Sequence, residues 1–377
     1  MKRTVFLTGA TGSIGSALVP KLLADTETDV VLMIRADDVA GLQTRLADML
    51  TYWQWHSADA HATRIHAVRG DISEPGLGLH PRDLARIVSG CSHIIHCAAS
   101  VKLNMSLDQA RATAVTPTRA MLALARQCAQ SGQLQKVDLV STVGVWGRTP
   151  GLMPERPLPE VTEFHNTYEA AKSEAEGVIF SEGRDLPITV HRPSMVVGAA
   201  DSGRALHFQV FYHLCEFLSG TRTFGVMPDL GLTRLDTVPV DWVAEVIDWS
   251  SRHQQSAGRI FHLCSGPQNA IALGRLQQEV RRVWRAHDRK VPGLRPISRA
   301  WLERLVPVIG ALAGQKTRRA LRGLSPVLAY LAEDQGFANT ETARTLAAAG
   351  LPLPLVDSYL ERVLGYYLDA QRKPATA

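Results

Sequence analysis

The sequence lacks the features that mark several large classes of protein. Its 377 residues include only five cysteines, none in a CxxC pair, at positions 91, 97, 128, 215 and 264. An odd number without paired spacing argues against a disulfide framework or a zinc site and favours a reducing compartment. No apolar run reaches the roughly 18 residues that a membrane span requires, and no signal peptide is visible. We therefore expect a soluble, cytoplasmic protein without a bound metal.

A strong overall charge is also missing, but the positive charge is unevenly placed. The net charge is +5, and Arg275 to Arg322 contains thirteen Lys and Arg against three Asp and Glu. A basic block can face phosphorylated ligands or an anionic membrane, or it can form solvated helix faces. We keep three interpretations open: a rim including Lys316 to Arg322 that binds phosphates of CoA or phosphopantetheine, peripheral membrane contact, and solvated helix faces. We expect no nucleic-acid partner.

What the sequence does contain is a regular alternation of strand and helix patterns. Short β-branched runs lie near residues 4–7, 30–35, 64–68, 93–99 and 137–143, and helical patterns separate them. This rhythm predicts an α/β Rossmann fold, with a doubly wound parallel sheet. After about Gly198 the rhythm breaks, and helical patterns dominate from Ser298. We expect a cofactor domain at 1–200, to which 234–267 returns, and a smaller, mainly helical substrate-binding cap at 201–233 and 268–377.

A glycine-rich turn follows the first predicted strand. Its residues, with the spacing GxxGxxG, are Thr8-Gly9-Ala10-Thr11-Gly12-Ser13-Ile14-Gly15. Glycine at these points lets the strand turn tightly, the backbone approach a pyrophosphate, and the helix pack close to the sheet. The free N–H groups and dipole of the following helix favour an anion there. Because the turn lies between a strand and a helix, we interpret it as a dinucleotide site rather than a plain turn.

The end of the second strand indicates which dinucleotide binds. An acidic residue here binds the ribose of NAD, whereas an arginine suits the 2′-phosphate of NADP. This strand ends in Arg35 with no acid before Asp37, and Arg45 in the next helix can reach the same phosphate. The pattern favours NADP(H), although Arg45 alone also fits an ordinary surface arginine.

Two further strand ends carry candidate cofactor contacts. Asp71 and Ile72 follow the third strand, where a carboxylate can accept the adenine amino group and Ile72 can pack on the ring. Asp71 can equally cap a turn. Ala98 and Ala99 follow the fourth strand, and their small side chains let the backbone approach a ribose or nicotinamide. We interpret His96, just before them, as a core histidine with a local hydrogen bond.

A tyrosine and a lysine four residues apart carry the predicted chemistry. Tyr168 and Lys172 lie on one face of a predicted helix. A free phenol has a pKa near 10, and we expect the neighbouring ammonium and an oxidised nicotinamide to lower it. Tyr168 can then give a proton to oxygen as hydride reaches carbon. The spacing alone is common on solvated helices, but here it follows the glycine-rich turn and a strand that ends at Thr142.

Several motifs in one order make the chain resemble the extended short-chain dehydrogenase/reductase superfamily. From Arg3 to about Pro267 they are TGATGSIG, GDI, HCAAS, VSTVGVWG, YEAAK, HRPSMVVG and DTVPVDWVAEVI. Within the superfamily, IRA after the second strand, GDISEPGLGL and VPVDWVA look most like the thioester reductases. These include the reductase domains of carboxylic acid reductases and the fatty acyl-CoA reductases of the male-sterility type.

The resemblance implies a role for each matching residue. Thr142 matches the residue that hydrogen-bonds the substrate carbonyl, and Tyr168 and Lys172 match the catalytic pair. The positions that match the NADP(H) site are Gly9, Thr11, Gly12, Ser13, Ile14, Gly15, Arg35, Arg45, Asp71, Ile72, Ala98, Ala99 and Ser100, with Pro193, Ser194 and Val196 beside the nicotinamide.

One motif departs from the family pattern. The family often has Asn-Val-x-Gly-Thr in the helix before the catalytic strand, whereas this chain has Ala114-Val115-Thr116-Pro117-Thr118. In relatives the Asn supports a helix kink and a proton-relay water, so the relay is left open here. Pro117 can kink the helix instead.

The resemblance implies an NADPH-dependent reductase that transfers hydride to an acyl thioester, bound to CoA or a carrier protein, giving an aldehyde or alcohol. One alternative is an extended reductase acting on a ketone, an aldehyde or a 3β-hydroxysteroid-like substrate. A sugar-nucleotide epimerase or dehydratase is another, although epimerases usually keep NAD, which Arg35 disfavours. A non-catalytic NADP-binding scaffold is a third. Many relatives dimerise through the helices that match 107–130 and 166–181, so a homodimer is a further expectation.

Overall fold

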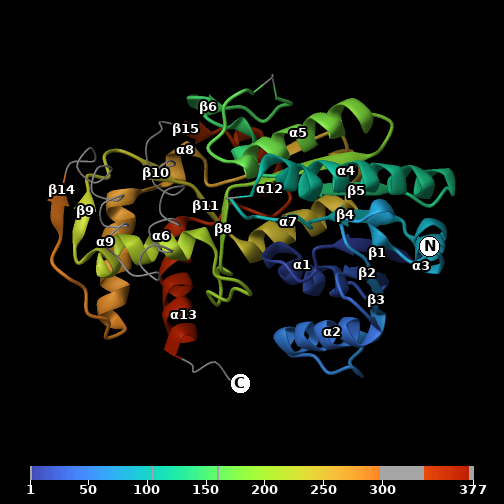
Figure 1. Ribbon diagram of the computed structural model, residues 1–377, viewed down its shortest axis with the longest axis horizontal. Coiled ribbons are helices and arrows are strands. Elements are labelled where there is room, and N and C mark those ends of the chain that lie inside the picture. The colour runs from blue at the N-terminus through green and yellow to red at the C-terminus, as the bar shows by residue number, and fades with distance from the viewer. Residues whose placement is uncertain (1, 104, 159–160, 298–334, 373–377) are drawn as a thin grey trace.

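A parallel sheet of seven strands forms the centre of the molecule (Figure 1). In the order β12-β7-β5-β4-β1-β2-β3, its strands are Ile260–Leu263, Ile188–Pro193, Lys136–Val140, His93–His96, Arg3–Thr8, Thr28–Ile34 and Ile65–Arg69. The computed structural model describes residues 2–103, 105–158, 161–297 and 335–372. Successive strands are added to one side of β1 as far as β3 and then to its other side from β4 onward, and ligands bind at such a switch point in open α/β sheets. The predicted Rossmann fold is confirmed.

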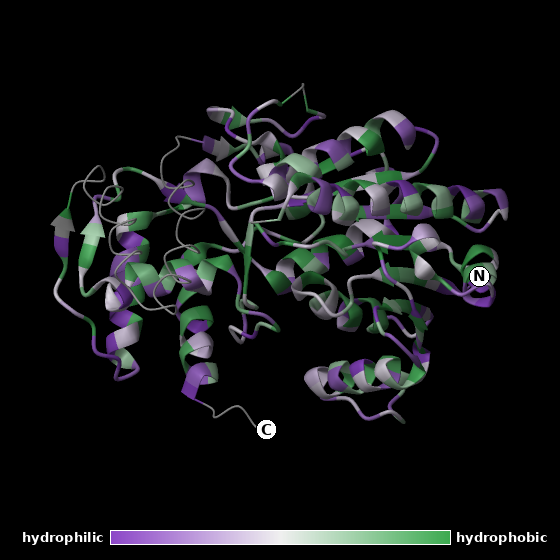
Figure 2. Cartoon of the chain, in the orientation of Figure 1, coloured by the Kyte–Doolittle hydropathy of each residue, from purple (hydrophilic) through white to green (hydrophobic). Residues whose placement is uncertain are grey.

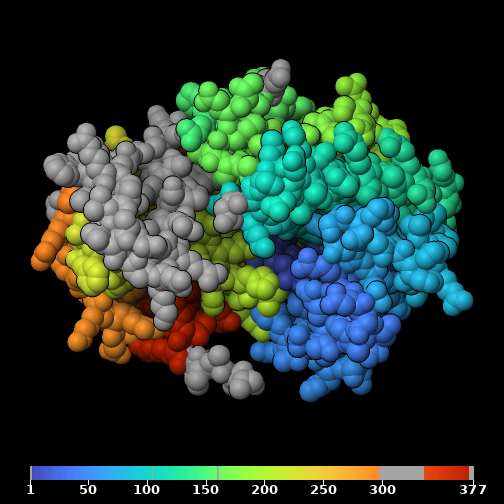
Figure 3. Space-filling view, viewed as in Figure 1, coloured from blue at the N-terminus to red at the C-terminus, as the bar shows by residue number. Residues whose placement is uncertain are grey.

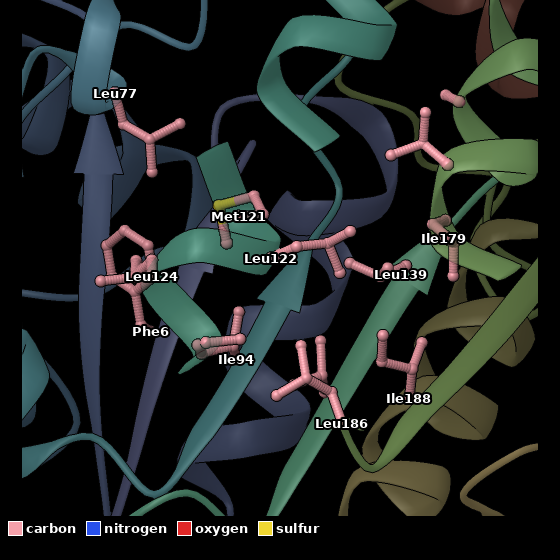
Figure 4. Close-up of a cluster of buried hydrophobic side chains, with 14 of the residues drawn as sticks. Phe6, Leu77, Ile94, Met121, Leu122, Leu124, Leu139, Ile179, Leu186 and Ile188 are labelled. Atoms are coloured by element: carbon pink, nitrogen blue, oxygen red, sulfur yellow. The ribbon is translucent and has the colours of Figure 1, made fainter. Parts of the chain in front are cut away.

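Three helices cover one face of this sheet. They are α3 (Pro81–Gly90), α4 (Leu107–Gln130) and α5 (Thr167–Glu182). Ser106 and Gln109 form a capping box at the start of α4, which satisfies backbone groups that the helix cannot pair. The side chains of this layer labelled in Figure 4 are Phe6, Leu77, Ile94, Met121, Leu122, Leu124, Leu139, Ile179, Leu186 and Ile188. Burial of these apolar side chains holds α4 and α5 against the strands that carry the site.

Three exposed ion pairs join α4 to α5. Arg111 pairs with Glu174 at 2.7 Å, and Arg119 pairs with Glu182 at 3.0 Å. Arg126 of α4 pairs with Asp185, just beyond α5, at 2.9 Å. Each such surface pair adds about 0–1 kcal/mol to stability, so the contacts define the alignment of the helices more than their stability.

The opposite face is covered by α1 (Ser13–Leu23), α2 (Val39–Trp53) and α7 (Val240–Arg252). Leu18, Leu22 and Val243 pack there with strand residues in a second buried cluster. The indole Nε1 of Trp53 donates to the carbonyl oxygen of Ser16 at 2.7 Å. This bond joins α2 to the helix that begins at the glycine-rich turn.

A third apolar cluster lies beside the sheet, in the part of the chain predicted to form a cap. It is built from α6 (Val210–Leu218), α9 (Leu273–Ala286) and α13 (Leu360–Arg372), with Phe211, Tyr212 and Tyr367 in its core. Figure 2 shows hydrophobic and hydrophilic residues side by side on α9 and α13, as expected of helices with one buried face.

Small two-stranded sheets surround this cluster and the site. They pair β8 (Met195–Val197) with β11 (Thr237–Pro239), β9 (Val226–Pro228) with β14 (Arg295–Ile297), β10 (Arg234–Leu235) with β13 (Ile271–Ala272), and β6 (Gly151–Met153) with β15 (Gln335–Phe337). The helix α12 (Thr340–Ala348) follows β15. None of the helices in the described ranges is long and apolar enough to cross a bilayer.

Three arginines in the described part of the basic block contact other segments of the protein. Arg275 pairs with Asp357, and Arg282 pairs with Glu361. Arg281 donates to the carbonyl oxygens of Ser219 and Pro292, both at 2.7 Å. These contacts join α9 to Asp357, Glu361, Ser219 and Pro292, and the role of the basic block stays a prediction. The predicted rim at Lys316 to Arg322 lies outside the described residues.

Candidate active site

The predicted catalytic residues lie at the carboxyl edge of the sheet. Thr142 follows β5 and caps the short 3-10 helix η3 (Val143–Trp146), where its hydroxyl accepts from the Gly144 N–H at 3.1 Å. Tyr168 lies in the first turn of α5. A polar interaction with the Thr142 side chain favours the ionised form of the Tyr168 phenol. The structure thus brings together the two residues that we expect to hold a substrate oxygen.

Lys172 lies one turn further along α5 and is buried. Its Nζ atom donates to the carbonyl oxygen of Val140 at 2.9 Å. Burial lowers the pKa of Lys172 to about 8, although the Glu176 carboxylate opposes that change. The residue therefore titrates close to neutral pH, within the range in which enzymes operate.

The protonation of Tyr168 differs from the sequence-based prediction. Burial, followed by the nearby Glu169 carboxylate, raises the pKa of Tyr168 above its ordinary value, and the interaction with Thr142 lowers it only in part. The Lys172 charge alone does not lower this pKa, because the phenolate would lose the water around it. Tyr168 is consequently a neutral phenol that is ready to donate its proton. The expected effect of an oxidised nicotinamide stays a prediction.

Sequence reasoning missed Glu169, which is buried beside the phenol. Its Oε2 atom accepts from the backbone N–H of His165 at 3.1 Å and lies 2.8 Å from the His165 Nδ1 atom. The same side chain packs against Gly144, where an added Cβ would come within 3.2 Å of the carboxylate. Glu169 therefore links the start of α5 to the turn after Thr142. An acid among the apolar residues of a buried helical turn was the available signal.

The glycine-rich turn has the close packing that a dinucleotide site requires. Gly9 has a φ of +81°, and a Cβ there would lie 2.6 Å from the Ala98 nitrogen. A Cβ on Gly15 would lie 2.2 Å from the Gly9 carbonyl oxygen. Larger residues at either position would push the turn away from the sheet.

The N-terminus of α1 is also left open for an anion. In the described chain, Gly12 provides no side-chain cap and the first turn, which includes Ser13 and Ile14, holds no acidic residue. By contrast, Asp38 caps α2 and Asn166 caps α5 with side-chain oxygens. Uncapped N–H groups at a helix start fit a pyrophosphate, so the residues present suit a dinucleotide cofactor.

Three arginines line a pocket of about 510 Å³ next to this turn. Arg45 donates to the Arg35 carbonyl oxygen at 2.6 Å and to the Thr11 hydroxyl at 3.2 Å, so it reaches from α2 to the glycine-rich turn, and its contact with a phosphate stays a prediction. Arg69, at the end of β3, lines the same pocket and was not predicted. Its position directly before the Gly70-Asp71 motif was the signal for it. Several guanidinium groups around one pocket suit a phosphate group.

Asp71 serves as a turn cap in the structure. Its Oδ1 atom accepts from the Ser73 backbone N–H at 2.9 Å and from the Ser73 hydroxyl at 2.7 Å. Its Oδ2 atom lies 4.0 Å from the Arg35 Nε atom. Asp71 therefore lines the arginine pocket while fixing its own turn, and the neighbouring Ile72 packs on the buried cluster under α4.

The remaining predicted cofactor residues follow the ends of β4 and β7. The Ala98 N–H donates to the Thr8 hydroxyl at 3.4 Å, and Ala99 and Ser100 continue this segment. His96 Nδ1 lies 2.7 Å from the Thr8 hydroxyl oxygen, which confirms the prediction of a core histidine with a local hydrogen bond.

After β7, the Ser194 N–H donates to the Leu263 carbonyl oxygen at 3.0 Å. Pro193 closes β7 and Val196 lies in β8. These residues are held at the same edge of the sheet as Thr142, which is where a nicotinamide would have to reach the phenol.

The helix that departs from the family pattern runs without a break through its proline. Pro117 lies inside α4 and has no N–H to give to the carbonyl of Thr113. The Thr118 hydroxyl donates to the Ala114 carbonyl oxygen at 2.8 Å. Pro117 replaces the Gly of the family's Asn-Val-x-Gly-Thr string. The local consequence is that the Thr113 carbonyl loses this backbone donor.

Comparison with known families agrees with this geometry. Residues 7–247 match the family model described as Male sterility protein. The chain belongs to this family. As a Male sterility family member it lies in the thioester-reductase branch of the extended short-chain dehydrogenases/reductases, and it is an oxidoreductase that uses a nicotinamide cofactor.

The relatives of this Male sterility family member named here are larger proteins, and the chain matches one part of each. The chain is 32% identical over 244 residues to an isonitrile lipopeptide synthase of Streptomyces coeruleorubidus, covering 64% of this chain and 16% of the synthase. It is 28% identical to a nonribosomal peptide synthetase of a Cladobotryum species, covering 97% of this chain and 36% of the synthetase. The chain thus spans well under half of either relative.

A solved structure covers the whole chain. The terminal R domain from the myxalamid PKS-NRPS biosynthetic pathway superposes with a TM-score of 0.81 at 26% identity, covering 100% of this chain and 92% of that domain. The match includes the part after residue 247, where the family model ends. The described helices α9 and α13 therefore belong to an arrangement that this R domain shares.

Proposed function

We propose that the chain uses NADPH to reduce an acyl thioester, carried by CoA or a carrier protein, to an aldehyde that a second hydride takes to the alcohol. The observation that carries this proposal is the grouping of a neutral Tyr168 with Thr142 at the end of β5 and with Lys172 one helical turn along α5. The relatives described above supply the substrate class, since they include a reductase domain and peptide synthetases.

The arginine pocket supports the choice of NADPH over NADH. Arg35, Arg45 and Arg69 would hold the 2′-phosphate, because guanidinium groups bind phosphate oxygens with charge-assisted hydrogen bonds. The open start of α1 would hold the pyrophosphate. When bound, NADPH supplies the hydride.

Side chains of this protein would stabilise the negative charge that develops on the thioester oxygen. Thr142 and Tyr168 donate hydrogen bonds to the thioester carbonyl, which stabilise the negative charge that develops as hydride adds to carbon. Tyr168 then gives its proton to that oxygen, forming a hemithioacetal. The Lys172 ammonium stabilises the resulting tyrosinate.

Collapse of the hemithioacetal completes the proposed reaction. Its C–S bond breaks as the carbon–oxygen double bond forms, and the hydroxyl proton leaves as the thiol takes one up. The products are an aldehyde and free CoA or carrier thiol. In this proposal residues 201–233 and 268–377 form the cap that binds the acyl chain. The homodimer and peripheral membrane contact remain predictions.

The test is a direct assay with purified protein. NADPH oxidation should depend on added acyl-CoA or acyl-pantetheine thioester, with aldehyde or alcohol detected by mass spectrometry and free thiol released in step. Turnover of ketones, hydroxysteroids or sugar nucleotides without thioester turnover would contradict the proposal. NADPH binding without turnover of any of these would favour the scaffold alternative.

A further inference from the structure

The segment between β8 and α6 lies over the glycine-rich turn. This segment, residues 199–209, is called the clasp below. The His207 Nε2 atom lies 3.0 Å from the Thr11 carbonyl oxygen, and the Gln209 amide donates to the Ser13 hydroxyl at 3.4 Å. Because a carbonyl oxygen only accepts, the imidazole Nε2–H must be the donor. Thr11 and Ser13 flank Gly12, the residue at the open start of α1.

The clasp is fastened to the Rossmann layers at two other points. The Ala200 N–H donates to both carboxylate oxygens of Asp241 at 2.9 Å. The Arg204 guanidinium lies 4.3 Å from the ring centre of Tyr52 and donates to the Tyr52 carbonyl oxygen. His207 and Gln209 are therefore held in place over the turn by contacts on the same segment.

The clasp also belongs to the apolar cluster that contains α6 and α13. The ring of Phe208, between the two donors, packs edge-on against Tyr212 and Tyr367, with 4.9 Å between ring centres in each case. In Figure 1 the yellow-green connection after β8 descends beside α1 before entering α6. In Figure 3 yellow-green atoms meet the blue N-terminal region at the centre of the view.

We propose that His207 and Gln209 bind the pyrophosphate of the dinucleotide, so that the clasp closes the cofactor site from the side of the substrate cap. Their present acceptors are an uncharged carbonyl and a hydroxyl. A phosphate oxygen at the start of α1 is a stronger acceptor, because charge-assisted hydrogen bonds are roughly twice as strong as neutral ones. The inference rests on the proposed dinucleotide binding and adds residues beyond the glycine-rich turn to it.

The experiment compares a ligand that has a pyrophosphate with one that lacks it. Dissociation constants for NADPH and for 2′-AMP are measured with the wild type and with the double variant His207→Ala/Gln209→Ala. Two lost bonds to a charged group should weaken NADPH binding by about tenfold or more, while 2′-AMP binding is unchanged. His213→Ala is the matched control, because this histidine of α6 is 59% exposed and turned toward Glu216. Thermal unfolding of each variant checks the fold.

Other results would overturn the proposal. Unchanged NADPH affinity in the double variant means that the clasp does not touch the cofactor. Equal weakening of NADPH and 2′-AMP means that the clasp only supports the surrounding fold.

Binding of NADH and of a ligand without a pyrophosphate tests the clasp separately from the assignment of NADP as the cofactor. If the wild type prefers NADH, the assignment of the arginine pocket fails, yet a tenfold loss for NADH beside unchanged binding of adenosine, which has no phosphate, still supports the clasp. If the wild type binds neither dinucleotide, the proposed function and the clasp both fail.

Discussion

The Lys172 ammonium donates a hydrogen bond of 2.9 Å to the carbonyl oxygen of Val140. Val140 is the last residue of β5, and Thr142 lies two positions beyond it. Lys172 and Tyr168 share α5. This bond therefore joins the helix that carries the proposed proton donor to the strand end that leads to Thr142.

The pH dependence of turnover should report on Lys172. Burial lowers the pKa of Lys172 to about 8, so the residue is an ammonium below that pH and a neutral amine above it. We expect kcat/KM to fall as pH rises through about 8, because a neutral amine cannot stabilise the tyrosinate. In Lys172→Arg, which stays protonated, this limb of the profile should move to higher pH. A limb that stays in place would assign it to another group.

Replacing Tyr168 by Phe should remove the proton donor without removing the cofactor. General acid catalysis contributes about 10²–10⁴-fold to rate, and kcat for thioester reduction should fall by that range. The dissociation constant for NADPH, measured by fluorescence titration, should be unchanged. Tyr366→Phe, at a tyrosine of α13 outside the predicted catalytic residues, serves as the control and should keep full activity. Retention of most activity in Tyr168→Phe would rule out the phenol as the acid.

Arg69 should matter for NADPH and not for NADH. In Arg69→Ala the pocket keeps Arg35 and Arg45 but loses one guanidinium, and KM for NADPH should rise about tenfold at low salt. KM for NADH should stay within error, since NADH lacks the 2′-phosphate. Arg82→Ala removes an exposed arginine of α3 and should change neither value. Equal effects on both cofactors would show that Arg69 supports the fold rather than the 2′-phosphate.

The buried pair of Arg192 and Glu176 should be a large contributor to stability. Arg192 Nε donates to Glu176 Oε1 at 2.9 Å, and its Nη1 donates to the Arg156 carbonyl oxygen at 3.0 Å. Arg192→Met leaves a buried carboxylate without its cation, which costs about 3–5 kcal/mol of unfolding free energy. Urea titration measures this loss.

A matched surface pair provides the control for that measurement. Arg126→Ala removes the cation of the exposed pair with Asp185 and should cost at most about 1 kcal/mol. Similar losses in both variants would mean that water reaches Glu176 and relieves its charge.

The glycine-rich turn and the parallel Rossmann sheet could be predicted from the sequence, because both depend on a repeated β-α pattern. The family resemblance, and not a spacing, grouped Thr142 with Tyr168. The raised pKa of Tyr168 could not, since it follows from burial and from the Glu169 carboxylate. Burial is a property of the packed chain and is not encoded in a local motif.

Contacts between segments far apart in the chain could not be predicted from the sequence either. His207 contacts Thr11, which lies 196 positions earlier in the chain. That contact depends on how Phe208 of the clasp packs against Tyr212 and Tyr367. Arg69 follows a recognisable strand, but its place in the arginine pocket depends on the pairing of β3 with β2.

The spacing of the ion pairs between α4 and α5 fixes the alignment of α5, and with it the position of the site residues that α5 carries. Glu174 and Glu182 lie eight residues apart on the outside of α5 and meet arginines that are also eight apart on α4. A helix turns by about 100° per residue, so inserting one residue between Lys172 and Glu174 would rotate the charged face away from α4 or swing Tyr168 and Lys172 away from Thr142. Length changes in α5 should therefore be far more harmful than changes of charge on its surface.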